Sequence, residues 1–75
     1  MAEVDQGLGY EEMRVLNRLL SQGPATLPEI ANEQGWRQRR ARKVMQGLEK
    51  RDLTNEAGGV WWITPSGMVT MRGTS

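Results

Sequence analysis

The first part of the chain carries apolar residues at helical spacing in the stretch YEEMRVLNRLLSQG. These residues fall into two strips, Met13 with Leu16 and Leu20, and Val15 with Leu19. Spacings of three and four residues place side chains on one face of an α-helix. The pattern therefore predicts a helix over about 10–22 that is covered on two sides, and Gly23 with Pro24 ends it.

A second helix is predicted to begin at the sequence TLPE. Thr26 is the candidate N-cap, Pro28 lies in the first turn, where a missing N–H costs nothing, and Glu29 completes a capping box. We expect this short helix to run to about Gln34, where Gly35 ends it.

A third helix is predicted over about 37–52. Its apolar residues recur at i, i+3, i+4 and i+7, which defines the buried face: Ala41, Val44, Met45 and Leu48. Trp36 lies in the tight turn before this helix, and we interpret it as an apolar plug of the core.

The pattern changes in the last third of the chain, where 53–56 and 60–63 are β-prone and an Ala-Gly-Gly sequence between them is typical of a hairpin turn. Alternation places Trp61 and Ile63 toward the core and leaves Trp62 partly exposed. Trp62 is therefore a candidate contact for a partner.

The order of elements predicts an α+β winged helix-turn-helix. It comprises a three-helix core, a two-stranded hairpin as the wing and a short C-terminal helix that Thr64 and Pro65 cap. We expect one domain over 10–72, a flexible N-terminal segment over 1–9 and a tail over 73–75.

The amino-acid composition limits the classes of function that the chain can have. The chain has 75 residues and contains neither Cys nor His, which excludes disulfides and thiolate metal sites. Apolar runs are far shorter than the roughly 20 residues of a membrane span, and the N-terminus lacks a signal-peptide pattern. We expect a soluble cytoplasmic protein without a cofactor or metal. Catalysis without His or Cys would need paired carboxylates, a Ser-Lys arrangement or a metal bound by carboxylates. Adjacent Glu11 and Glu12 diverge on a helix, and a 75-residue core leaves little room for a substrate pocket, so we expect no enzyme.

Charge is unevenly distributed. Residues 37–51 contain seven Lys and Arg against Glu49, a net charge of +6, so the remainder of this +1 chain sums to −5. The face opposite the buried stripe collects Arg39, Lys43, Gln46 and Lys50, flanked by Arg40 and Arg42. Lys50 and Arg51 near the C-terminal end suit the helix dipole, so we interpret them as solvated. The asymmetry predicts a polyanionic partner.

Several of these cations destabilise the helix that carries them. Arg37, Arg39 and Arg40 lie in the first turns, where the helix dipole disfavours cations by a few tenths of a kcal/mol. Arg39 also repels Arg42 and Lys43 at spacings of three and four. A face that only meets water would carry acids there, so a nucleic-acid ligand is favoured over a solvated face.

Three short sequences give the chain a family resemblance. LPEIANEQGW resembles the second helix and turn, LEKRDL the end of the recognition helix, and WITPSG the segment after the wing, of regulators of the multiple-antibiotic-resistance-regulator (MarR) type. The resemblance covers about 55 of the 75 residues. It identifies the fold superfamily more firmly than one family.

The resemblance implies that the third helix enters the DNA major groove. The residues that it implicates are Arg37, Gln38, Arg39, Arg40, Arg42, Lys43 and Gln46. Arg39, Arg42 and Gln46 are candidates for reading bases, because Arg suits guanine and Gln suits adenine. Arg40 and Lys43 are assigned to phosphates.

The start of the second helix, at Thr26 and Leu27, also offers N–H groups to a phosphate. The sequence departs from the family pattern at three points. Arg37 replaces the usual Ser or Thr cap, the wing carries Glu56 and no cation, and long terminal helices are missing. Pairing on DNA, as a homodimer or cooperatively, stays open, and we expect no small-molecule ligand.

The sequence therefore predicts a small transcriptional regulator that binds double-stranded DNA sequence-specifically. One alternative is a protein-interaction winged helix within a larger assembly, which Trp62, Val15 and Leu19 would serve. An accessory factor in recombination or replication is another, and RNA is a third partner class, although no surface aromatic platform is evident.

Overall fold

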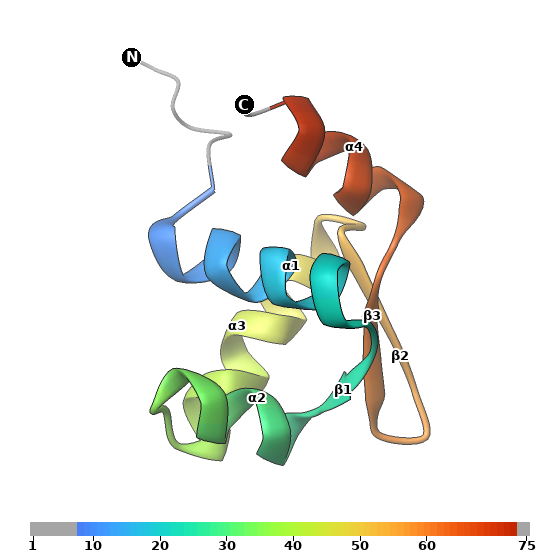
Figure 1. Cartoon of the computed structure of the whole chain (residues 1–75). Helices are drawn as coiled ribbons and strands as arrows, with labels where there is room; N and C mark the ends of the chain where they lie inside the picture. Colours follow the sequence, from blue (N-terminus) through green and yellow to red (C-terminus); the bar gives the residue numbers. More distant parts are fainter. Residues whose placement is uncertain (1–7, 74–75) are drawn as a thin grey trace.

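A computed structural model describes residues 8–73 and shows four helices and a small sheet (Figure 1). The elements follow in the order α1 (Tyr10–Gln22), β1 (Ala25–Thr26), α2 (Leu27–Gln34), α3 (Gln38–Lys50), β2 (Thr54–Ala57), β3 (Val60–Ile63) and α4 (Pro65–Gly73). The α+β winged helix-turn-helix prediction is confirmed.

The sheet has three strands rather than the two predicted. Its order is β1-β3-β2 and all pairs are antiparallel. Ala25 of β1 pairs with Trp61 of β3, so the segment between the first two helices joins the wing. The two residues of β1 are too few to show a period in the sequence.

The core lies between the helices and the sheet. Its buried apolar residues come from every element except β2 and α4, together with the loop after α3: Val15, Leu16, Leu19, Ala25, Ile30, Ala31, Ala41, Met45, Leu48, Leu53, Trp61 and Ile63. The prediction for Leu20 is wrong, since its side chain is 46% exposed. Val15, Leu16 and Leu19 centre the buried stripe of α1, and Leu20 lies about 100° farther round the helix. Because Val15 and Leu19 are buried in the core, the expectation that they serve as a contact surface for a protein partner is wrong.

The predicted start and end of α2 are confirmed. The Glu29 N–H donates to Thr26 Oγ1, and the Thr26 N–H donates to Glu29 Oε1 at 2.9 Å, which closes the capping box. Gly35 ends the helix in the left-handed conformation, with φ of 75°. These local signals set the residues at which α2 begins and ends.

The wing is a tight hairpin. Ala57 pairs directly with Val60, so the turn consists of Gly58 and Gly59, with φ of 59° and 85°. Two successive positive φ values are typical of a type I′ turn. The turn is thus one residue shorter than the predicted Ala-Gly-Gly turn. Burial of Trp61 and Ile63 is confirmed.

Residues 1–7 and 74–75, which make up most of the expected N-terminal segment 1–9 and of the tail 73–75, lie outside the described residues. The domain limits of 10–72 stay a prediction. Within residues 8–73, each helix is too short or too polar to cross a membrane.

Candidate nucleic-acid interface

The interface is built on α3, which begins one residue later and ends two residues earlier than the predicted 37–52. Arg37 is the N-cap, its side chain makes no capping hydrogen bond, and the first turn contains no acid. Ala41, Met45 and Leu48 are buried, as predicted, and Val44 is half-buried. The helix is therefore anchored by its apolar stripe and not by its N-terminal cap.

The N-cap residue and the six residues of α3 that were predicted to meet DNA are all exposed: Arg37, Gln38, Arg39, Arg40, Arg42, Lys43 and Gln46. Within residues 8–73, Arg37, Arg39, Arg42 and Lys43 have no acidic side chain within ion-pair distance and no hydrogen-bond acceptor for their side chains. Their charges therefore remain available to an external anion.

Arg40 differs from the other cations because it is held by two neighbours. Its guanidinium forms an ion pair with Glu11 of α1 and lies over the indole of Trp36, with Cζ 5.5 Å from the ring centroid. Its side chain is still 52% exposed. The ion pair orients Arg40 toward α1 and neutralises part of its charge.

Trp36 is not the buried plug that the sequence predicted. The residue is half-buried and packs against the core, but its side chain also lines a surface pocket of about 470 Å³. The pocket is otherwise lined by Gly35 and four cations, Arg37, Arg39, Arg40 and Lys43. We call this feature the Trp36 pocket.

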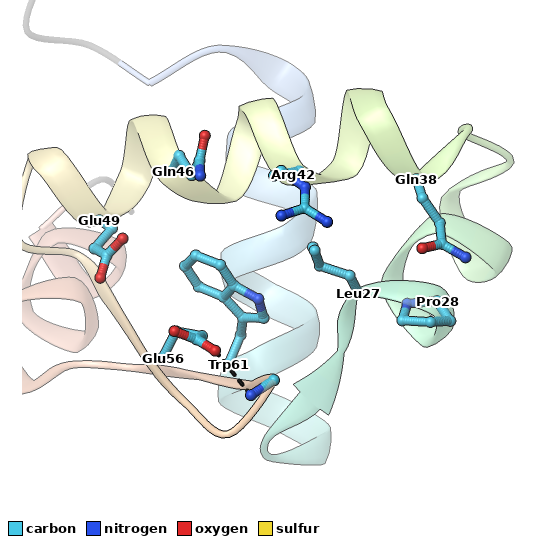
Figure 2. A pocket seen from close by; sticks show the side chains of 9 residues that line it. Leu27, Pro28, Gln38, Arg42, Gln46, Glu49, Glu56 and Trp61 are labelled. Carbon is cyan, nitrogen blue, oxygen red and sulfur yellow. Dashed lines mark hydrogen bonds between the residues drawn. The ribbon is translucent and has the colours of Figure 1, made fainter.

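A second hollow, of about 340 Å³, lies between α3 and the wing (Figure 2). We call it the wing groove, and its lining comprises Leu27, Pro28, Gln38, Arg42, Gln46, Glu49, Glu56, Gly59 and Trp61. Figure 2 shows Arg42 extending from α3 toward the space between Leu27 and Trp61. Glu49 and Glu56 line the end of the groove that lies away from Gln38 and Pro28.

Two predicted contacts lie apart from the exposed face of α3. Both the N–H and the Oγ1 of Thr26 are engaged with Glu29 in the capping box, so Thr26 is committed to starting α2. Trp62 is half-buried and pairs with Asn55 of β2 in the sheet. Its role as a partner contact stays a prediction.

The sequence analysis identified Glu49 and Glu56 but did not place them together beside α3, and it did not predict the pairing of Glu11 with Arg40. Glu49 lies seven residues after Arg42, so helical periodicity alone places it on the same side of α3. Glu56 joins it only because the hairpin folds back against α3, and Glu11 meets Arg40 across 29 positions of sequence. No local pattern signals either of these two contacts.

Comparison with known families gives a match over most of the chain. A family model described as the sugar-specific transcriptional regulator TrmB matches residues 3–59. No curated protein sequence is significantly similar to the chain.

Solved structures of bacterial regulators share the fold. BpsR of Bordetella bronchiseptica is 23% identical with a TM-score of 0.84, and the match covers 95% of this chain and 55% of BpsR. A MarR family regulator from Neisseria meningitidis is 20% identical with a TM-score of 0.78, covering 92% and 54%. ZitR of Lactococcus lactis, solved in complex with DNA, is 19% identical with a TM-score of 0.76, covering 96% and 53%.

The chain spans about half the length of these three structural relatives. DNA binding by BpsR is described as regulated by 6-hydroxynicotinic acid, and the TrmB family model is described as sugar-specific. The expectation that this chain binds no small molecule therefore finds no support in the comparisons.

Proposed function

Because the chain belongs to the TrmB family of transcriptional regulators, we propose that it binds double-stranded DNA sequence-specifically and inserts α3 into the major groove. A helix with its side chains fits the width of that groove. The exposed face of α3 is then the surface that recognises the DNA sequence of the regulated site.

The observation that carries the proposal is the set of unneutralised cations on one face of α3. Arg37, Arg39 and Lys43 face solvent and have no acidic partner among residues 8–73. This concentration disfavours the helix by itself, through the dipole and like-charge repulsion. A bound polyanion neutralises these charges and removes that cost. A purely structural role of α3 would not explain why the cations are gathered there.

Base reading is assigned to the polar side chains that accompany these cations. Arg39 and Arg42 can each donate two hydrogen bonds to guanine, and Gln46 can pair with the edge of adenine. Gln38, in the first turn, is assigned to a base or a phosphate. A single module of this size buries about 600–1,000 Å² on DNA, so we expect modest affinity unless two copies bind neighbouring sites.

The decisive experiment measures binding to duplex DNA against salt concentration. About four phosphate contacts predict a log–log slope near −3 to −4. Arg37→Ala combined with Lys43→Ala is expected to flatten the slope by about 2. The matched control, Arg14→Ala with Arg72→Ala, makes the same change in net charge at exposed residues of α1 and α4.

A log–log slope near −1 for the unmodified protein would show that α3 does not carry the phosphate contacts. Equal flattening of the slope by the two double variants would show the same. Absence of binding by the unmodified protein at low salt would refute DNA as the ligand, and a protein partner would become the leading alternative.

A further inference from the structure

The two flanks of α3 have opposite electrostatic character. On one flank, the Trp36 pocket gathers Arg37, Arg39, Arg40 and Lys43, with Glu11 as the acid paired to Arg40. On the other flank, the wing groove contains Arg42 as its cation together with Glu49 and Glu56. The first hollow is strongly positive and the second is weakly negative.

The wing does not reverse this difference. Residues 53–64, which form the hairpin and its ends, include Glu56 and no Lys or Arg. The carboxylate of Glu56 is held in place by the Gly59 N–H at 2.8 Å, so the charge is fixed beside the turn. Figure 2 shows this contact as a dashed line within the groove.

A helix in the major groove has the phosphate backbone of one strand on each of its flanks. If α3 binds DNA as proposed above, its two flanks therefore face different strands. Phosphates are attracted to a cationic flank and repelled by a carboxylate one.

We propose that the protein binds the DNA phosphates on only one flank of α3. The Trp36 pocket holds the phosphates of one strand, while Glu49 and Glu56 keep the phosphates of the other strand out of the wing groove. The indole of Trp36 offers an apolar surface against which a deoxyribose can pack, and it also stacks with the Arg40 guanidinium. Arg42, in the wing groove, then reads a base edge without contacting phosphate.

This arrangement gives Glu49 and Glu56 a definite role. Repulsive groups lower affinity for every duplex, so binding depends more on correct contacts to base edges. The two carboxylates are thus determinants of specificity that act by repulsion.

The first test removes the carboxylate charges. Glu49→Gln and Glu56→Gln each keep an oxygen acceptor, and for Glu56 that acceptor can still bond the Gly59 N–H. Each is expected to raise affinity for random-sequence duplex about twofold to fivefold at low salt, because a charge near the DNA surface is only partly screened.

Glu12→Gln is the control, since Glu12 lies on α1, lines neither hollow and keeps its acceptor for the Gly9 N–H. Unlike the other two substitutions, it also removes an ion pair, the one between Glu12 and Arg51 at 3.7 Å. It is expected to change affinity by less than about 1.5-fold, because screening weakens distant charges. Equal gains for all three variants would mean that only net charge matters, which overturns the proposal.

The second test compares cations of the two flanks. Arg37→Gln, in the Trp36 pocket, is expected to flatten the salt slope by about 0.9, the value for one phosphate contact. Arg42→Gln, in the wing groove, is expected to flatten it by less than about half of that. Equal flattening would refute one-sided binding.

The inference rests on DNA binding but fails separately from it. If the unmodified protein binds duplex with the expected slope and these variants show no asymmetry, only the one-sided arrangement is wrong. Circular dichroism melting of each variant excludes unfolding as the cause of any loss.

Discussion

Arg18 of α1 and Glu33 of α2 are joined by two side-chain hydrogen bonds, Nε to Oε1 at 2.7 Å and Nη2 to Oε2 at 3.1 Å. Arg18 Nη1 also donates to the Gly23 carbonyl at 2.6 Å, where α1 ends. A guanidinium that meets a carboxylate with two donors fixes geometry as well as charge. This contact holds α2 against α1, and α2 in turn packs against α3.

The Arg18–Glu33 pair makes stability depend on pH. The hydrogen bond from Arg18 is the main cause that lowers the pKa of Glu33 below its ordinary value near 4.5, and the same bond raises the pKa of Arg18. A carboxyl with a lowered pKa in the folded state stabilises the protein above its unfolded pKa and loses that contribution as pH falls through the folded value. The loss is expected below about pH 4.5.

Glu33→Gln removes this titration. We expect the variant to be less stable than the unmodified protein by about 1 kcal/mol near neutral pH, since the pair is partly exposed. The difference in melting temperature is expected to narrow as the pH falls below about 4.5. A difference that stays constant over this range would show that the charge of Glu33 contributes nothing.

Thr26 offers a test between a structural and a DNA-binding role. Because its Oγ1 accepts from the Glu29 N–H, Thr26→Ala is expected to lower the free energy of unfolding by about 1 kcal/mol. The slope of DNA affinity against salt is expected to stay unchanged. Thr26→Ser, which keeps the hydroxyl, is the control. A flattened slope with unchanged stability would make Thr26 a phosphate contact instead.

Gly67 in α4 is required by a close approach of neighbouring chain segments. A Cβ at this position would lie 2.4 Å from the Leu53 carbonyl oxygen and 2.7 Å from Ile63 Cγ1. Gly67→Ala is therefore expected to destabilise the protein by about 1–3 kcal/mol in urea denaturation.

Gly47→Ala is the matched control for Gly67→Ala, because a Cβ on Gly47 in α3 would meet no atom within 4 Å. It is expected to stabilise the protein by about 0.5–1 kcal/mol through helix propensity. If both alanines raised stability, the close approach at Gly67 would not restrict the side chain.

The features of the fold that could be predicted are those set by neighbouring residues. Thr26 and Glu29 form a capping box within one turn, and Gly35 directly follows the last residue of α2. The buried stripe that contains Met45 follows from helical periodicity alone. The third strand, β1, could not be predicted, because its pairing with β3 arises from tertiary contact and its two residues carry no pattern.

The basic face of α3 could also be predicted from the sequence, but the difference in charge between its two flanks could not. Periodicity places Arg39 and Lys43 on the exposed side without further information. The ion pair of Arg40 with Glu11, and the approach of Glu56 to the flank that carries Arg42, depend on how α1 and the hairpin pack. Charge clustering was therefore visible in the sequence, and charge asymmetry required the structure.

Arg42 and Lys43 are adjacent in sequence yet line different hollows, so their substitution is expected to have different consequences. Arg42→Ala is expected to relax base selectivity, because a bidentate pair discriminates against a wrong base by about 1–3 kcal/mol. Lys43→Ala is expected to weaken binding to all sequences alike and to flatten the salt slope by about 1. Selection of sites from a random duplex pool with each variant measures the difference. Retention of the full sequence preference by Arg42→Ala would remove Arg42 from base reading and leave that role to Arg39 and Gln46.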